Sequence, residues 1–456
     1  MIPSQVIEEI RHLLGAEHVL DSTALALKNP GIDPHNLAAG WLARPQNTEE
    51  LQQLVRICAQ HEIAMVTQGG RTSLSQGAIS TPGQLIVSME RFNHIRELNP
   101  LSRTAVIEAG VKLAQLDDAL AAHQLSMGLD LGARDQATIG GLTATNAGGN
   151  EAFRHGCMRE RVLGLEVVLA NGECLSELHQ VRKCNEGFAI ERQFIGSEGC
   201  LGIITAVSVD LVSRPHYRAT ALVGIEGYSQ AVQCITALRF KPELLAAEVL
   251  CEGQARYALE RIDALPKTPP AGQVLLLIEF TGTSDTEAQA TLAATLERLF
   301  EDELILDAWF AKNAAERAAF WRVREDWAVD QRYPGGLWYD VSVPIEHIPT
   351  YLSQVTASLQ QHDPSLQLFV VGHLADGNLH LTVNCDHDIH ERYEEIAPLI
   401  THSLKSIGGS FSAEHGIGLE KKQTLLRESS AVKHAWMRQL KLFWDPKNLL
   451  NPHKVL

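Results

Sequence analysis

Residues 131–150 read LGARDQATIGGLTATNAGGN, and this stretch decides how the first half of the chain is interpreted. Two glycine pairs and three threonines lie within residues 138–150. Ordering so many glycines costs backbone entropy, which indicates that the main chain must approach something closely here. A second stretch, QGGRTSLSQGA at residues 68–78, follows an expected strand, and a third, GSEGCLGIIT, occupies residues 196–205. Alone, residues 68–78 fit a tight solvent-exposed loop. Together, the three stretches predict a cradle whose main-chain N–H groups face a phosphate.

Composition limits the classes of partner and the compartment. The 456 residues include 39 Lys and Arg against 55 Asp and Glu, which gives a net charge of −16. So acidic a chain repels nucleic acid and anionic lipid, so neither is expected as a main partner. The 8 cysteines form no Cys-x-x-Cys pair, which argues against iron–sulfur clusters and zinc ribbons and favours reduced thiols in the cytoplasm. We expect neither a signal peptide nor a membrane span.

The order of expected elements predicts an α+β fold. Helices are expected at residues 4–14 and 47–61, and Asn171-Gly172 predicts a hairpin turn. After residue 215 the pattern becomes strand, helix, strand, strand, helix, which is typical of a ferredoxin-like unit. Residues 314–330 are expected to form one helix, and a last helix is expected near residues 434–443. We therefore divide the chain into domains at 1–215 and 216–425 and a C-terminal helical segment at 426–456 that returns to the first domain.

A histidine pair flanks an Asp-Gly turn in VVGHLADGNLHLTV, residues 370–383. If Asp376-Gly377 is a two-residue type I′ turn, His373 lies directly opposite His380, with Cβ atoms about 5 Å apart on one face of the sheet. Two imidazoles held in this way can share a metal ion. The alternative is a pair of structural histidines beside a turn. A third ligand has to come from elsewhere, and GGSFSAEHGIGLEKK, residues 408–422, offers Glu414 and the adjacent histidine.

The order of the motifs GG-x-T, LDLGA, IGG, TNAGG, GLEVVLANG and FIGSEGCLGIIT over residues 41–215 resembles the FAD-binding domain of the vanillyl-alcohol oxidase and p-cresol methylhydroxylase superfamily. The resemblance implies a two-subdomain FAD-binding domain with a substrate or cap domain. Some members tether FAD through a histidine in the first loop. Here Arg71 lies in that loop and no histidine does, so non-covalent FAD is expected. The FAD contacts that the resemblance implies are Gln68, Gly69, Gly70, Arg71, Thr72, Ser73, Leu74, Gly77, Asp130, Thr138, Ile139, Gly140, Gly141, Thr145, Asn146, Ala147, Gly148, Gly149, Gly202, Ile203 and Asn451.

The pairing of GHLADGNLH with SAEHGIG further resembles the metal-dependent, FAD-linked D-2-hydroxyacid dehydrogenases, which include D-2-hydroxyglutarate and D-lactate dehydrogenases. The resemblance implies oxidation of a D-2-hydroxy acid to the 2-oxo acid with hydride transfer to flavin N5. It implies that Zn²⁺ (or Mn²⁺ or Fe²⁺) binds His373, His380 and Glu414, that His415 is the catalytic base and binds substrate, and that Arg324 binds the substrate carboxylate. It also implies electron-transfer flavoprotein or a quinone as acceptor, and we expect a homodimer.

Three positions depart from the D-2-hydroxyglutarate dehydrogenase pattern. Trp338 stands where those enzymes usually have Lys, Ala328 where they have Thr, and Thr382 where they have Asn. We therefore expect Trp338 and Thr382 to line a site for D-lactate or an aliphatic 2-hydroxy acid rather than for D-2-hydroxyglutarate. Two alternatives are kept: an oxygen-using flavin oxidase of an alcohol or sugar, and a flavin-binding subunit of a glycolate oxidase complex.

Overall fold

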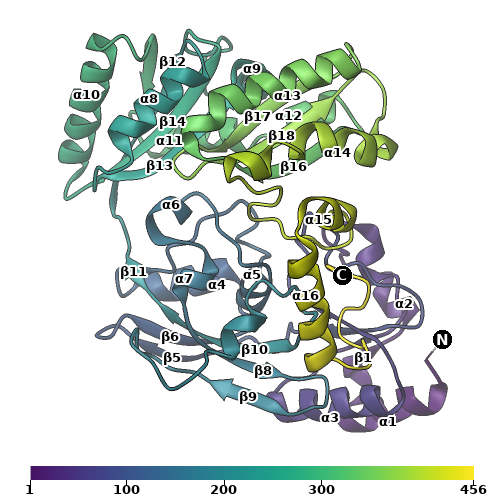
Figure 1. Ribbon diagram of the computed structural model, residues 1–456. Helices are drawn as coiled ribbons and strands as arrows, with labels where there is room; N and C mark the ends of the chain where they lie inside the picture. Colours follow the sequence, from purple (N-terminus) through teal and green to yellow (C-terminus); the bar gives the residue numbers. More distant parts are fainter. Residues whose placement is uncertain (1) are drawn as a thin grey trace. The chain divides into compact units, whose positions relative to one another are not determined.

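The computed structural model describes residues 2–456, which pack as two units. Unit 1 comprises Met1–Gly149, His155–Arg214 and Glu414–Leu456, and unit 2 comprises Asn150–Arg154 and Pro215–Ala413. The chain therefore leaves unit 1, builds unit 2 and returns. The division at 215/216 and 425/426 expected from the sequence stays a proposal beside this description. Figure 1 labels the elements of each unit along the chain.

Unit 1 contains a four-stranded sheet in the order β1-β2-β4-β3, with strands Val19–Leu20, Leu42–Ala43, Leu85–Ser88 and Met65–Gln68. Helices α1 (Ser4–Leu14) and α3 (Thr48–Gln60) pack on each other beside it. The α3 helix begins where Asn47 accepts a hydrogen bond from the main chain of Glu50, so the helix predicted at residues 47–61 is confirmed.

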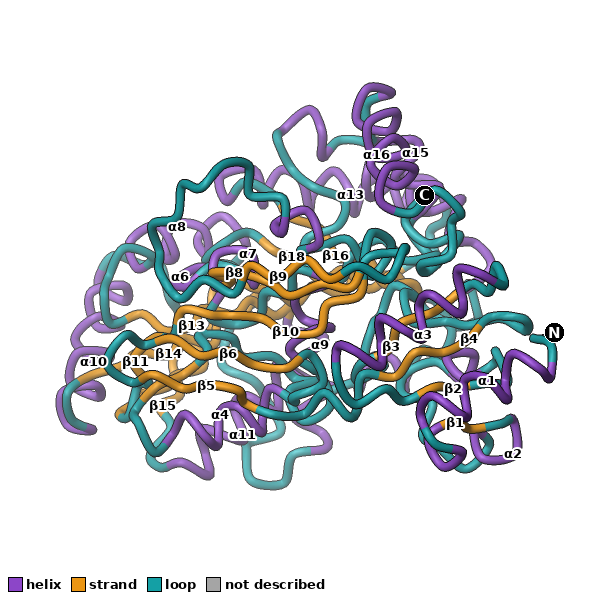
Figure 2. Tube along the Cα trace, turned by 90° about the horizontal axis from the view of Figure 1, so that it is seen from below, coloured by secondary structure: helices purple, strands orange, loops and turns teal. Residues whose placement is uncertain are grey.

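A second sheet of unit 1 has the strand order β5-β6-β10-β8-β9. Its strands are Ile95–Asn99, Thr104–Glu108, Ile203–Asp210, Val162–Val168 and Cys174–Glu177, all antiparallel, and they are drawn in orange in Figure 2. The hairpin expected at Asn171-Gly172 joins the last two strands. Other elements of unit 1 include α2 (Ser22–Leu25), α4 (Leu113–Ala121), β7 (Leu125–Ser126), α5 (Ile139–Thr145), α7 (Met158–Arg161), β11 (Val212–Ser213), α15 (Lys422–Glu428) and α16 (Ala431–Trp444). One apolar core joins both sheets.

Unit 2 is built on one seven-stranded antiparallel sheet in the order β15-β12-β14-β13-β17-β18-β16. The strands are Asp307–Phe310, Tyr217–Ile225, Val274–Gly282, Leu244–Cys251, Gln367–His373, Asn378–Asn384 and Leu337–Ser342. The first four follow the order of a ferredoxin-like unit, as the sequence pattern predicts. One face packs on α8 (Tyr228–Leu238), α10 (Asp285–Glu301), α13 (Ile348–His362) and α14 (Tyr393–Thr401). The opposite face packs on α9 (Glu252–Arg261) and α11 (Ala314–Glu325).

The single helix expected at residues 314–330 is wrong, because α11 ends at Glu325 and a short helix, α12, spans Ala328–Arg332. Asp326 between them is extended. The unpredicted helix α9 holds this break: Gln254 donates to the carbonyl of Asp326 at 2.8 Å, and Arg261 donates to its carboxylate at 3.0 Å. A tertiary contact from a distant segment therefore interrupts a helix that local pattern alone favours.

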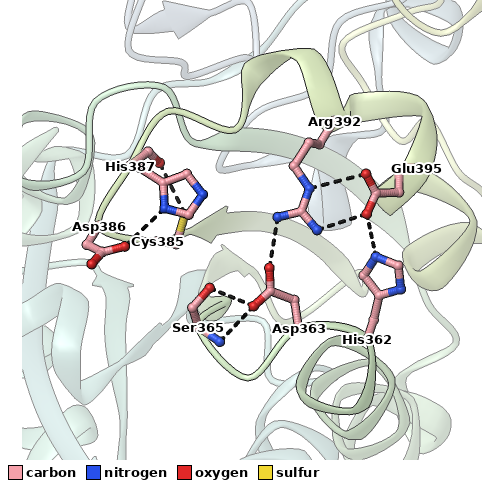
Figure 3. A network of polar contacts seen from close by, with 8 residues as sticks. All are labelled: His362, Asp363, Ser365, Cys385, Asp386, His387, Arg392 and Glu395. Carbon is pink, nitrogen blue, oxygen red and sulfur yellow. Dashed lines mark hydrogen bonds and ion pairs between the residues drawn. The ribbon is translucent and has the colours of Figure 1, made fainter.

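An exposed polar network ties the end of α13 to the start of α14 (Figure 3). The guanidinium of Arg392 bonds Asp363 at 2.8 Å and Glu395 at 2.8 and 3.2 Å. The hydrogen bonds from Arg392 and from His362 lower the pKa of Glu395 to about 2. Through these bonds, His362 and Asp363 at the end of α13 are joined to Arg392 and Glu395 at the start of α14. Among the described helices, none is long and apolar enough to cross a bilayer.

Candidate active site

The loop after β3 presents a run of unused main-chain donors. Strand β3 ends at Gln68, and the six amide groups of residues 69–74 donate no hydrogen bond to any group of the described chain. These residues are partly exposed, so their six main-chain donors are available to a ligand. Amides converging in one turn form a concave site for an anion. This geometry fits the pyrophosphate of the dinucleotide that the sequence predicts for Gly69 to Leu74.

Close main-chain packing holds that loop against the second glycine-rich segment. A Cβ atom on Gly69 would overlap the Thr138 hydroxyl, and one on Gly70 would overlap the carbonyl of Gln136. Gln68 closes the base of the loop, since its amide donates to the carbonyl of Ala78 at 2.8 Å. The loop can therefore pack this closely only because residues 69 and 70 have no side chain.

The other predicted cofactor residues all lie in unit 1. Thr138 is the N-cap of α5, and its hydroxyl accepts from the Gly141 amide at 3.4 Å. Gly149 has φ 108° and packs against the carbonyl of Asp130, where a Cβ would overlap. Asn451, from the C-terminal segment, donates to the carbonyls of Gly77 at 3.2 Å and Glu198 at 2.7 Å. The remaining predicted contacts on these loops and at the start of β10 are Arg71, Thr72, Ser73, Ile139, Gly140, Thr145, Asn146, Ala147, Gly148, Gly202 and Ile203.

The predicted third metal ligand and base lie on a segment of unit 1 that is bonded to both glycine-rich loops. The Glu414 carboxylate accepts from the Gly149 amide at 3.0 Å. The carbonyl of His415 accepts from the hydroxyl of Ser75 at 2.8 Å. Glu198 then accepts from the amides of residues 417 and 418 at 2.7 and 2.8 Å. Burial raises the pKa of Glu198 although these amides oppose the rise. The predicted base is thus bonded to the loops predicted to hold the cofactor.

The histidine hairpin of unit 2 uses a different turn from the predicted one. His373 pairs with Asn378, and His380 pairs with Val371, so four residues, 374–377, form the turn. The prediction that His373 lies directly opposite His380 is wrong. The side chain of Leu374 is fully buried and its amide donates to the Ala247 carbonyl at 2.9 Å, which draws this residue out of the hairpin ladder.

The two histidines still share one face of the sheet. The observed register differs from the predicted one by two residues, and only an odd shift would move a side chain to the opposite face. The two imidazoles lie diagonally, with ring centroids 5.3 Å apart and planes at 85°. Both side chains are buried. Their rings are therefore close enough to bind one ion despite the different turn.

Each histidine has a buried carboxylate near its Nδ1 atom. Glu248, fully buried on β13, lies 2.8 Å from Nδ1 of His373, and Asp340 on β16 lies 3.5 Å from Nδ1 of His380. Burial would raise the pKa of Glu248, but His373 and Arg324 outweigh it and lower that pKa. The hydrogen bond of His373 Nδ1 to Glu248 fixes the tautomer of that imidazole and orients Nε2 as its candidate metal-binding atom, an arrangement that is common in metal sites.

Sequence reasoning missed both carboxylates. Glu248 is a lone acid inside the apolar run LLAAEVLC of β13, and a charge at the centre of a buried strand is itself a signal of a specific partner. Asp340 lies in the YDVS segment of β16, where its carboxylate also accepts from the Asn378 amide at 2.8 Å and from the Ala413 amide at 3.1 Å.

The predicted substrate residues of unit 2 lie on the face that carries the histidines. Arg324 donates through Nε to Glu248 at 2.9 Å, and its two Nη atoms make no hydrogen bond with the described chain. Trp338 and Thr382 are directly opposite each other on β16 and β18, one row beyond the pair Asp340 and His380. Arg324, Trp338, Thr382 and the histidines thus belong to one surface of unit 2.

Two family models match the chain. The model described as FAD binding domain matches residues 40–176, and the model described as FAD linked oxidases, C-terminal domain, matches residues 214–455. Among solved structures, p-cresol methylhydroxylase with substrate bound has a TM-score of 0.78 at 19% identity and covers 99% of this chain and 96% of its own. An alkyldihydroxyacetonephosphate synthase has a TM-score of 0.72 at 17% identity, covering 100% and 86%. At such identities these likenesses show the fold, which is the predicted α+β fold.

Two curated relatives are closer in sequence. The mitochondrial D-2-hydroxyglutarate dehydrogenase of Rattus norvegicus is 33% identical over 417 residues, covering 91% of this chain and 78% of the relative. The D-2-hydroxyglutarate dehydrogenase of Xanthomonas citri pv. viticola is 32% identical over 450 residues, covering 95% and 94%. These matches extend over both units.

Proposed function

Because the chain belongs to the FAD-linked oxidase family, in the group that contains the D-2-hydroxyglutarate dehydrogenases, and is an FAD-dependent oxidoreductase acting on a hydroxyl group, we propose that it oxidises a D-2-hydroxy acid to the 2-oxo acid. The observation that carries this proposal is the anchoring of Glu414 and His415. In unit 1 these residues are bonded to the two loops that fit FAD. FAD is held without a covalent bond in this proposal.

A divalent metal ion, Zn²⁺ or alternatively Mn²⁺ or Fe²⁺, is proposed to bind His373, His380 and Glu414. Two imidazoles and a carboxylate are the donor set of an open, catalytic site rather than of a closed structural one. Chain connectivity supports the third ligand: Glu414 directly follows Ala413, whose amide bonds Asp340, and consecutive Cα atoms are about 3.8 Å apart. When bound, FAD supplies the two-electron acceptor for the C2 hydride, and the metal supplies a Lewis acid for the hydroxyl group.

The protein's own groups position the substrate and move its proton. Arg324 is held by Glu248 through Nε, so its two Nη atoms can bind the substrate carboxylate as a planar fork. His415 takes the hydroxyl proton on an imidazole nitrogen, since imidazole titrates near neutral pH. Loss of the hydroxyl proton and of the C2 hydride converts the D-2-hydroxy acid into the 2-oxo acid.

We further propose that D-lactate or an aliphatic 2-hydroxy acid is preferred to D-2-hydroxyglutarate. Trp338 and Thr382 occupy adjacent positions in the row beyond the histidines, and Ala328 begins α12. None of these three side chains carries the positive charge that a second carboxylate requires. Electron-transfer flavoprotein or a quinone is proposed as the acceptor, with a homodimer in the cytoplasm as the form of the protein.

A dye-coupled screen tests this function. D- and L-forms of lactate, malate, 2-hydroxyisovalerate and 2-hydroxyglutarate are assayed with an artificial acceptor, with and without a chelator. We expect the D-forms to be oxidised, and we expect the chelator to suppress this oxidation. Turnover without the dye, with peroxide release under air, would favour the oxygen-using oxidase. Absence of turnover with every 2-hydroxy acid would contradict the proposal.

A further inference from the structure

A row of side chains beyond the metal-binding histidines defines how far a substrate side chain reaches. Thr382 is two residues past His380, and its neighbours across the sheet are Trp338 on one side and Phe369 on the other. Two residues along a strand span about 7 Å. That distance exceeds the methyl group of lactate and matches a longer aliphatic side chain. The terminal group of such a substrate side chain would therefore contact this row of residues.

A carboxylate without a cationic partner lies beside this row. Asp330 is in the middle of α12, and the side chain of Trp338 lies close to its carboxylate. Burial raises the pKa of Asp330 to about 6, and its own main-chain amide and the nearby Trp338 side chain only partly offset the rise. No salt bridge to Asp330 is formed by any residue in the described range 2–456. The nearest cation on the same helix, Arg332, instead lies over the ring of Tyr333.

Two indole rings complete the surroundings of this carboxylate. Trp327, which precedes α12, lies with its ring centroid 5.3 Å from that of Trp338. The side chain of Trp327 is 52% exposed, although a residue of this size is normally covered. The carboxylate and the two indoles all attract a positive charge. The carboxylate does so by its own charge, and the indoles do so by the negative faces of their rings.

We propose that Asp330, Trp338 and Trp327 form the side-chain end of the substrate site and select a D-2-hydroxy acid whose side chain ends in a cation, such as an ammonium group. This inference rests on the proposed D-2-hydroxyacid dehydrogenase activity and names its substrate class. A diacid is disfavoured here because its second carboxylate meets the negative charge of Asp330. The kcat/KM of a neutral aliphatic acid is expected to lie between those of the cationic and diacid substrates. The indoles accept its apolar chain, but it gains nothing from the Asp330 carboxylate.

Three substrates of matched chain length test the proposal: D-5-amino-2-hydroxypentanoate, D-2-hydroxypentanoate and D-2-hydroxyglutarate. Their kcat/KM values are compared in the dye-coupled assay with the FAD- and metal-loaded enzyme. The expected order is ammonium, neutral, diacid, with about a tenfold step between neighbours. Preference for the diacid overturns the inference while leaving the proposed function intact. If none of the D-2-hydroxy acids is oxidised, the proposed function itself is overturned.

Variants of Asp330 and Trp327 test whether these residues cause the preference for a cationic substrate side chain. Asp330→Asn should reduce the ammonium-to-diacid ratio of kcat/KM at least tenfold, and Trp327→Ala should reduce it as well. The Trp327 side chain is half exposed, so this second variant tests the idea even if the first does not fold. The control is Asp363→Asn, an acid of unit 2 outside this row, whose carboxylate bonds Arg392 instead. An unchanged ratio in both test variants, or an equal loss in the control, overturns the inference.

Discussion

Replacing Glu248 by Gln should weaken metal binding although Glu248 is not itself a proposed metal ligand. Its carboxylate is fully buried and bonds both His373, at 2.8 Å, and Arg324, at 2.9 Å. The amide of Gln keeps the volume but loses the charge, and it can present its NH₂ group to a nitrogen that needs an acceptor. His373 then loses the charged acceptor that fixes Nδ1 as the protonated atom and Nε2 as the unprotonated one.

The size of the effect follows from the role of such partners. Changing a carboxylate that orients a metal-bound histidine typically costs 10- to 100-fold in metal affinity, or about 1.4 to 2.8 kcal/mol. Folding stability falls too, because a hydrogen bond to a charged group contributes about 1.5 to 3 kcal/mol and two are altered here. Metal affinity and stability must therefore be measured separately.

The assay is a competition titration of Zn²⁺ between the protein and a chromophoric chelator, beside thermal unfolding of the same metal-free sample. The matched control is Glu279→Gln. Glu279 is also a buried acid of this sheet, but it bonds Arg218 at 2.9 Å and Trp321 at 3.0 Å. Both variants should lower Tm, and only Glu248→Gln should lower zinc affinity. Wild-type zinc affinity in Glu248→Gln, or an equal loss in the control, would refute the reasoning.

Three further changes have defined outcomes. Gly70→Ala should purify with little flavin absorbance because its Cβ overlaps the Gln136 carbonyl, whereas Gly132→Ala, with open space around it, should retain flavin; equal flavin in both would count against the cradle. Arg324→Lys should raise KM for the hydroxy acid about tenfold or more because one ammonium cannot replace the fork, and an unchanged KM in steady-state kinetics would remove Arg324 from substrate binding. Asp330→Asn should stabilise the protein by about 1 kcal/mol above pH 6, since a carboxyl whose pKa is raised by burial to about 6 costs about 3 kcal/mol when ionised, and partial exposure reduces this cost. The folded pKa of Asp330 is the raised one, so the wild-type carboxylate destabilises the fold once ionised; the gain in Tm should disappear below about pH 4, and a gain independent of pH would contradict this origin.

The cofactor loops could be predicted from the sequence because their signal is local. Gly70 and Gly149 pack against main-chain carbonyls and Gly69 packs against the Thr138 hydroxyl, so the sequence itself records these close contacts as glycines. The pairing of His373 with its strand neighbours could not be predicted. The Asp-Gly pair favours a two-residue turn, but burial of Leu374 and its bond to Ala247 select a four-residue turn. That outcome depends on a strand more than a hundred residues away.

The supporting acids were harder to find than the predicted ligands. Glu248 and Asp340 act through histidines that are distant in sequence, and only the strand order of unit 2 brings them to His373 and His380. The break between α11 and α12 depends likewise on Gln254 and Arg261 of a helix that the pattern did not reveal. Without that break, Trp327 and Asp330 would belong to one continuous helix.

Metal-dependent oxidation of a D-2-hydroxy acid is tested by anaerobic reduction of the bound flavin, which is followed by flavin absorbance. The metal-loaded protein, the same protein after chelation, and the chelated protein with Zn²⁺ restored are compared. Flavin should stay bound throughout, because the predicted cofactor residues lie in unit 1 and two of the three proposed ligands lie in unit 2. We expect rapid bleaching of the flavin by the D-form, loss of bleaching on metal removal, and recovery with Zn²⁺. Undiminished flavin reduction in protein that elemental analysis finds free of metal would contradict it.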